Sequence, residues 1–152
     1  MYAGKHAKLR PLQPAFIMAG SGETVTYREL DARSNRLAHL FRERGLKRLD
    51  HYAIFMENNS RYLEACGAGE RSGLYFTCVN SYLTPGELAY ILTNSESRIL
   101  ITSLAKLDVA REALKRCPRF SGGRFVPKTH HPRHEAAQGS IRSSPQPGRC
   151  RL

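Results

Sequence analysis

Three glycines between residues 67 and 73 form the first pattern in the chain that could bind a phosphate. Gly67, Gly69 and Gly73 resemble the glycine-rich turn of dinucleotide-binding sites, which lies directly between a strand and a helix. Here the preceding strand candidate ends near Met56, about ten residues earlier, and the last glycine comes one residue late. We therefore interpret these glycines as the small-residue face of a helix that packs closely on a sheet.

Residues 121–128 contain the nearest approach to a phosphate loop. Ser-Gly-Gly-Arg at 121–124 precedes Pro127-Lys128, but Phe125-Val126 lies between them. No helix follows, and the Gly-Lys-Ser/Thr ending that cradles phosphate is absent. We expect no nucleotide binding at this segment.

A group of side chains with metal-ligand chemistry lies near the C-terminus. They are His130, His131, His134, Glu135 and Cys150. A helix would place His130 and His134 on one face, but Pro132 between them argues against a helix. We expect at most weak binding of transition metals here. Ser34 and Ser60 have no nearby His or Asp partners, and we expect His39 and His51 to be surface or packing residues. The sequence thus assigns no catalytic, cofactor-binding or metal-binding residue.

Two capping boxes fix the starts of two helices. Thr26 and Glu29 have the T-x-x-E spacing, and the amphipathic stretch behind them runs to Gly45 with Arg33 on its polar side. Thr84 and Glu87 repeat the box with a proline at the first helical position. Ser60 is expected to cap another helix that ends at Gly73, and a last helix carries apolar residues from Leu104 to Leu114 until Pro118 ends it.

Short apolar runs alternate with these helices. They begin at Tyr52, Leu74 and Arg98, and the strand cores at Tyr52, Tyr75 and Ile99 are 23 and 24 residues apart. Connections of that length suit parallel strands, and the nearly uninterrupted run 52–56 suits a strand buried on both faces. We predict an α/β fold, an incomplete parallel-sheet unit of about three strands with flanking helices.

The charge of the chain is unevenly distributed. The 152 residues carry a net charge of +11. Residues 121–152 hold 6 basic and 1 acidic residue, 4 of the 8 prolines, and few large apolar side chains. The segment has four large apolar side chains, and their burial cannot offset the entropy of ordering 32 residues. We predict a folding unit over 1–120 and a disordered basic tail over 121–152.

Composition also excludes several classes of protein. The longest apolar run, Ala15–Ala19, is too short for a membrane span of about 20 residues or a leader, so we expect a cytoplasmic protein. The four cysteines form no C-x-x-C pair, and we expect them reduced, with Cys66 and Cys78 as small buried thiols. The basic clusters are only pairs such as Lys47-Arg48, so we expect no specific nucleic-acid binding. Weak electrostatic binding should largely vanish at about 150 mM salt.

Several short motifs in a fixed order resemble the AMP-forming acyl-CoA synthetases, in particular their fatty-acid-CoA ligase branch. The motifs are residues 25–30 with Asp31, Ser34, Asn35, Leu37 and Ala38; Glu57-Asn58; residues 71–75; Val79-Asn80; Leu83-Thr84; residues 87–92; Ser95; and the strand 99–102. The resemblance covers about Ala7 to Pro118. Asn80 then either shapes a turn, the interpretation we favour, or has an indirect role in an acyl pocket.

The resemblance implies an enzyme that activates a fatty acid with ATP to acyl-AMP and transfers the acyl group to CoA, with Mg²⁺ as cofactor. The family's Ser/Thr/Gly-rich loop ending in Pro-Lys, its aromatic-Thr-Glu segment, its ribose-binding Asp and its C-terminal Lys are all missing from the sequence. We therefore expect a truncated ligase that binds no cofactor and is inactive alone.

Two hypotheses address the missing part of such an enzyme. The tail has the composition of GC-rich coding sequence in a wrong frame, which suggests a frameshift or a split gene. Alternatively, the chain is a non-catalytic subunit that complements a separate polypeptide carrying the rest of the ligase.

Overall fold

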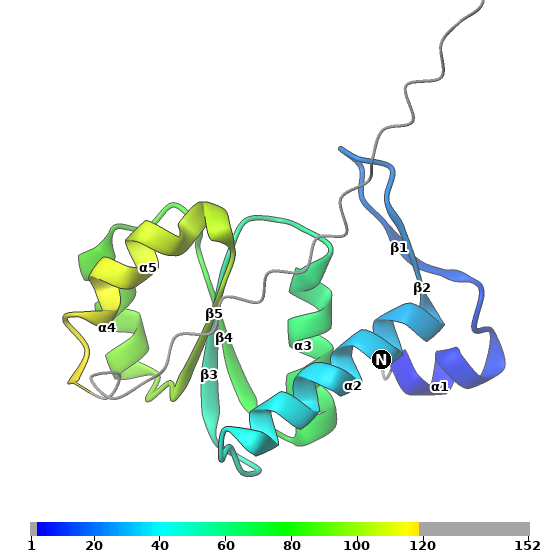
Figure 1. Ribbon diagram of the computed structural model, residues 1–152, viewed down its shortest axis with the longest axis horizontal. Coiled ribbons are helices and arrows are strands. Elements are labelled where there is room, and N and C mark those ends of the chain that lie inside the picture. Colours follow the sequence, from blue (N-terminus) through cyan, green and yellow to red (C-terminus); the bar gives the residue numbers. More distant parts are fainter. Residues whose placement is uncertain (1–2, 119–152) are drawn as a thin grey trace, which may run out of the picture.

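The apolar run around residue 54 forms the central strand of a three-stranded parallel sheet in the computed structural model, which describes residues 3–118 (Figure 1). This strand, β3 (His51–Phe55), lies between β4 (Tyr75–Val79) and β5 (Ile99–Thr102). Ile54 pairs with Cys78 on one side and with Ile101 on the other. The predicted parallel α/β sheet is confirmed.

Strand β3 is buried on both faces, as its sequence predicts. Tyr52 and Ile54 belong to a core on one face, whereas Ala53 and Phe55 belong to a second core on the other. All four residues have 0% of their surface exposed. Because successive side chains of a strand point to opposite faces of the sheet, this one short strand contributes to two separate cores.

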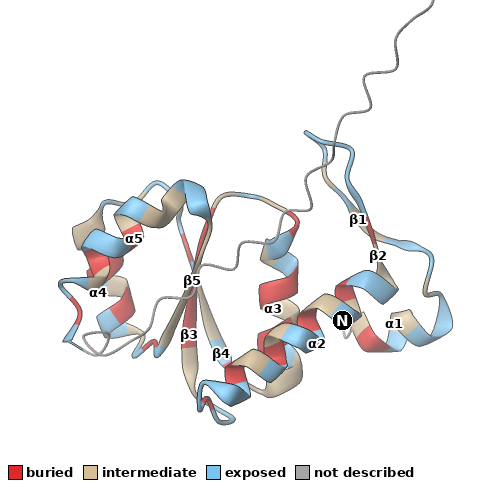
Figure 2. Cartoon of the chain, in the orientation of Figure 1, coloured by how far each residue is buried: buried red, intermediate tan, exposed pale blue. Residues whose placement is uncertain are grey.

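Helices cover both faces of this sheet (Figures 1 and 2). Helices α2 (Tyr27–Glu43) and α3 (Arg61–Ser72) contribute to the core with Tyr52 and Ile54. Helices α4 (Pro85–Asn94) and α5 (Leu107–Leu114) form the core on the other face. A 3₁₀ turn, Leu104–Lys106, precedes α5. Because the chain steps from β3 to β4 and then back across to β5, helices on opposite faces give both crossovers the same hand.

Both capping boxes form as predicted. The Thr26 amide donates to Glu29 Oε2 over 2.9 Å, and the Glu29 amide donates to Thr26 Oγ1 over 3.3 Å. Thr84 and Glu87 make the same reciprocal pair at the start of α4. The hydrogen bonds from the Thr26 amide and hydroxyl lower the pKa of Glu29. Each box satisfies backbone groups that a helix N-terminus otherwise leaves unpaired.

Replacing Thr26 tests the first box. Thr26→Ala should lower the free energy of unfolding by about 1 kcal/mol, whereas Thr26→Ser should retain most of the stability. Since the folded state lowers the pKa of Glu29, the carboxylate contributes stability above its unfolded pKa and loses it as pH falls through the folded value. Urea unfolding of the three proteins at several pH values measures both effects. Equal losses for the Ala and Ser variants would contradict a capping role for the hydroxyl.

Ion pairs join α2 to α3 on the outer side of the core that contains Tyr52 and Ile54. Arg33 Nη1 lies 3.2 Å from Glu64 Oε1, and within α3 Arg61 Nη1 lies 2.9 Å from the same oxygen. Arg71 pairs with Asp31 across the two helices. The sequence predicts Arg33 on the polar side of α2, and the structure adds that Glu64 of α3 reaches it there.

Some elements differ from the sequence prediction. An additional helix, α1 (Ala3–Leu9), and a hairpin of β1 (Pro14–Ile17) and β2 (Thr24–Thr26) precede α2. Ser60 makes no capping hydrogen bond. Instead, Asn59 Oδ1 accepts from the Arg61 amide over 2.9 Å.

Two side chains are more exposed than the sequence predicts. Leu104 lies in the 3₁₀ turn rather than on the apolar side of the last helix, and 66% of its surface is exposed. Cys78 is exposed, not buried, because β4 is paired on one side only among residues 3–118. The predicted disordered tail, 121–152, lies outside the described residues.

Candidate functional site

A pocket of about 560 Å³ lies at the carboxyl ends of β3 and β4. The helix that follows β3 and the helix that follows β4 lie on opposite faces of the sheet, so the two connections part here. In open α/β sheets such a crevice is the usual ligand site. We call it the carboxyl-end pocket. Its lining consists of Met56, Glu57, Asn58, Tyr62, Cys78, Val79, Asn80, Ser81 and Tyr82.

Among the described residues, Glu57 is the only charged one in that lining. The Ser103 hydroxyl donates to Glu57 Oε2, and Asn59 Nδ2 donates to Glu57 Oε1 over 3.3 Å. Burial raises the pKa of Glu57, but these hydrogen bonds and the nearby Lys106 more than offset burial, and the net pKa is lowered. The pocket therefore presents a carboxylate that stays ionised, and it would repel phosphate groups.

Ser103 should control the ionisation of Glu57. Ser103→Ala removes a donor to the carboxylate and should move the pKa of Glu57 up toward its ordinary value. The stability lost should be under about 1 kcal/mol, because solvent screens the interaction. The variant should be less stable than the wild type only at pH values above the pKa of Glu57, where the wild-type carboxylate is ionised. Carboxyl carbon shifts followed by NMR against pH measure this. Ser81→Ala, in the same lining, is the matched control and should leave that pKa unchanged; equal shifts in both variants would refute the assignment.

Asn80 lies at the end of β4 and also lines the carboxyl-end pocket. Its Oδ1 accepts a hydrogen bond from the Tyr82 amide over 3.0 Å, which is the geometry of an Asx turn. The predicted turn-shaping role is confirmed. An acyl-pocket role for Asn80 stays a prediction.

A tyrosine and two cysteines meet on the α3 side of this pocket. Cys78 lies close enough to the Tyr62 hydroxyl and the Cys66 thiol to raise the pKa of both groups. Burial is the largest cause that raises the pKa of Tyr62, and it raises the pKa of Cys66 to about 12. Neither this cluster nor the Glu57–Ser103 pair follows from sequence spacing, because each joins residues from separate elements.

The glycines of α3 have the packing role that the sequence predicts. A Cβ on Gly69 would lie 2.3 Å from Tyr52 Oη, and a Cβ on Gly67 would lie 3.2 Å from Ser34 Cβ. Ser34 is fully buried, and its hydroxyl donates to the Asp31 carbonyl. Gly73 ends α3 with φ of 63°, a left-handed value that suits glycine. These positions hold helices against each other and against the sheet.

The histidines that the structure describes also have structural surroundings. His39 is exposed on α2, and the ring of His51 packs edge-on against Tyr75 with centroids 5.1 Å apart. Within residues 3–118, no three His, Cys, Asp or Glu side chains come together as a metal site. The candidates at 121–128, and His130, His131, His134, Glu135 and Cys150, lie outside the described residues.

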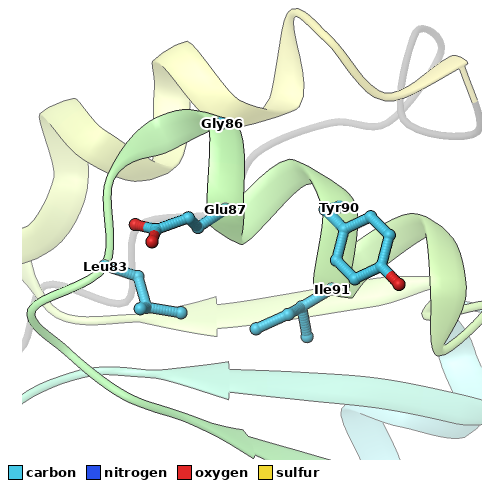
Figure 3. Close-up of a pocket in the computed structure, with 5 residues that line it drawn as sticks. All are labelled: Leu83, Gly86, Glu87, Tyr90 and Ile91. Atoms are coloured by element: carbon cyan, nitrogen blue, oxygen red, sulfur yellow. The ribbon is translucent and has the colours of Figure 1, made fainter.

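A second hollow is found on α4 and is mainly apolar (Figure 3). Leu83, Gly86, Glu87, Tyr90 and Ile91 line it. The Leu83 and Ile91 side chains lie on the same side of the helix in this view, and 70% of the surface of Tyr90 is exposed. The Glu87 carboxylate of this hollow is engaged by Thr84 in the capping box, so the hollow mainly offers apolar contact area.

The described residues do not fit ATP and Mg²⁺. Binding of the triphosphate needs positive charge or converging backbone amides, and binding of the metal needs clustered carboxylates. The carboxyl-end pocket has one carboxylate and no Lys or Arg in its lining among the described residues.

Across the described part of the chain, no helix is long and apolar enough to cross a bilayer.

Comparisons with known proteins identify the fold and the family. The AMP-binding enzyme family matches residues 4–146, which extends past Pro118. A long-chain-fatty-acid–CoA ligase of Salmonella typhimurium is 37% identical over 59% of this chain and 16% of its own length. A fatty acid–[acyl-carrier-protein] ligase of Streptomyces coeruleorubidus is 35% identical over 62% of this chain and 18% of its own. A benzoate CoA ligase of Burkholderia xenovorans superposes with a TM-score of 0.69 at 26% identity, covering 75% of this chain and 23% of the other.

The architecture is therefore that of the N-terminal domain of adenylate-forming CoA ligases. The chain belongs to the AMP-binding enzyme family and covers only the N-terminal part of the CoA ligases that it resembles. It spans 18% and 16% of the length of the two curated ligases above.

Proposed function

We propose that this chain supplies the N-terminal scaffold of an ATP-dependent fatty-acid–CoA ligase and does not itself activate a fatty acid. In the complete enzyme, the fatty-acid carboxylate would attack the α-phosphate of ATP and release pyrophosphate, and the thiol of CoA would then take the acyl group from acyl-AMP and release AMP. The observation that carries the proposal is a family match over residues 4–146 together with a carboxyl-end pocket in which Glu57 is the only charged lining residue among residues 3–118. An anionic crevice of this kind opposes binding of a triphosphate.

Fatty acid is the substrate class we propose for the complete enzyme, in the cytoplasm. Relatives named for fatty-acid ligation in Salmonella and Streptomyces support this choice. ATP, Mg²⁺ and CoA would then be bound by parts of the enzyme outside residues 3–118. The described residues contribute by holding the sheet and the strand ends in place.

The DNA sequence after the Pro118 codon tests the origin of the segment 121–152. We propose that this segment is read out of frame. All three frames should be translated downstream of that codon. The proposal expects one frame to encode the Ser/Thr/Gly-rich loop that ends in Pro-Lys. If none does, the frameshift and split-gene proposals both fail.

A second candidate function is complementation of a separate polypeptide that carries the rest of the ligase. The specific observation in favour is the surface left open over residues 3–118. Strands β4 and β5 each pair on one side only, and the hollow on α4 exposes Tyr90. Unpaired strand edges are ready templates for another chain. Co-expression with the downstream polypeptide should give co-purification and acyl-dependent activity; separate elution of the two chains would exclude this role.

A further inference from the structure

Cys66 and Cys78 face each other across the contact between α3 and β4. Cys78 lies two residues beyond Phe76 on the same side of β4, and a Cβ on Gly69 would lie 2.9 Å from Phe76. Cys66 lies three residues before Gly69 on the same face of α3. In a parallel crossover α3 runs antiparallel to β4. The turn of α3 that precedes Gly69 and carries Cys66 therefore lies beside the part of β4 that follows Phe76 and carries Cys78.

The glycine-rich face of α3 makes this approach close. An added Cβ at Gly69 would clash with both Tyr52 and Phe76, so the helix lies nearer to the sheet than a bulkier residue would permit. Cys78 also interacts with Cys66 and Tyr62 closely enough to raise the pKa of each group. Cys78 is exposed in the wall of the carboxyl-end pocket, and Cys66 is half-buried behind it.

We propose that Cys66 and Cys78 are a thiol pair that closes reversibly to an intramolecular disulfide when a low-molecular-weight disulfide, such as oxidised glutathione, enters the carboxyl-end pocket. This inference does not rest on the proposed function. It replaces the sequence-based expectation of two small buried thiols, because Cys78 is exposed.

The reaction proceeds by two thiol–disulfide exchanges. The Cys78 thiolate attacks one sulfur of oxidised glutathione, which forms a mixed disulfide and releases one glutathione thiolate. The Cys66 thiolate then attacks the Cys78 sulfur and releases the second glutathione. The protein loses two electrons and two protons, and one oxidised glutathione becomes two reduced molecules. Exposure assigns the first attack to Cys78. Burial raises the pKa of Cys66 to about 12, which makes it the resolving and slower thiol.

The other described cysteine provides the matched comparison. Cys117 is buried in the core on the opposite face of the sheet, and its thiol donates to the Ala89 carbonyl over 3.6 Å. It should neither react with the oxidant nor pair with Cys66 or Cys78. A cross-link from α3 to β4 should raise Tm by several degrees, because it closes a short loop and restricts the unfolded chain.

Mass spectrometry of the full 152-residue chain tests the pair. The chain carrying Cys150→Ser is equilibrated at about pH 8 with mixtures of reduced and oxidised glutathione, then trapped and digested with trypsin. Trypsin cleaves after Arg61, Arg71 and Arg98, so Cys66 and Cys78 fall in the separate peptides 62–71 and 72–98. The proposal expects these two peptides to be joined by a disulfide, with a loss of about 2 Da from the intact chain. Reduced glutathione should reverse the loss.

Variants assign the order of attack. Cys66→Ser should accumulate the glutathione adduct on Cys78, whereas Cys78→Ser should react more slowly and form no cross-link. A stable glutathione adduct on Cys78 in the protein with both thiols, or a dimer linked between chains, would overturn the proposal. So would equal labelling of Cys117. Because the peptide map is read first on the protein with both thiols, the cross-link is tested even if a variant fails to fold.

Discussion

Gly69→Ala should destabilise the protein by about 3 kcal/mol, close to the limit that a small domain tolerates. The added methyl group would lie 2.3 Å from Tyr52 Oη and 2.9 Å from both Tyr52 Cε1 and Phe76 Cδ1. Tyr52 has no free space to move, because it is fully buried and its hydroxyl donates to the Ala65 carbonyl over 2.6 Å. The substitution must therefore push α3 off the sheet or break that hydrogen bond, and both outcomes are costly.

Gly20→Ala is the matched control for this substitution. A Cβ at Gly20 meets nothing within 4 Å, and its backbone has no left-handed φ. It should change the free energy of unfolding by less than about 0.5 kcal/mol. Urea unfolding followed by circular dichroism compares the two variants. If Gly69→Ala is as stable as Gly20→Ala, the close contact between α3 and β3 is wrong.

Phe55→Ala should cost about 3–5 kcal/mol and should leave little folded protein. Phe55 has 0% of its surface exposed and lies in the core formed with α4 and α5. It pairs with Val79 on one side and Thr102 on the other, so the cavity would open at the centre of the sheet. A central strand cannot shift to fill a cavity without breaking both ladders.

Tyr90→Ala provides the comparison on the surface. Tyr90 is as large as Phe55, but 70% of its surface is exposed. Its loss should change stability by less than about 0.5 kcal/mol. A cost at Tyr90 comparable with that at Phe55 would mean that the hollow on α4 is covered in the protein as purified, for instance by self-association. Sedimentation at several concentrations would show such association directly.

Much of the three-layer fold follows from local sequence. The capping boxes at Thr26 and Thr84 predict where α2 and α4 begin, because a capping box uses only four consecutive residues. The run at 52–56 identifies the central strand, because two-sided burial requires an unbroken apolar stretch. The family, too, could be inferred from ordered short motifs such as Glu57-Asn58 and Val79-Asn80, and the match over 4–146 confirms it.

Features that depend on distant partners could not be inferred in this way. Strand β2 has only three residues, and pairing with β1 gives it a place that no local pattern predicts. Arg33 belongs to a polar stripe by sequence, but Glu64, thirty-one positions away, brings it into an ion pair. Cys78 occurs in an apolar run, yet it is exposed because β4 lies at a sheet edge over residues 3–118. In each case the missing information is which element lies alongside.

The candidate site also combines a local feature that could be predicted with a feature that depends on distant residues. Asn80 could be predicted as a turn residue, because an Asx turn is local. The carboxyl-end pocket itself could not be predicted, because its lining joins Glu57 and Tyr62, which follow β3, to Cys78 and Asn80 at the end of β4. Among residues 3–118, its lining holds one carboxylate, Glu57, and no Lys or Arg.

Acyl-dependent exchange of pyrophosphate into ATP tests most directly whether the chain can activate a fatty acid. The purified 152-residue chain is incubated with ATP, Mg²⁺, labelled pyrophosphate and a series of fatty acids, with benzoate included as an aryl acid. We predict no exchange above the level of a blank without protein, for any acid. Exchange that persists through rigorous purification and follows the chain on gel filtration would contradict the proposed scaffold role, because the chain would then carry a complete adenylation site.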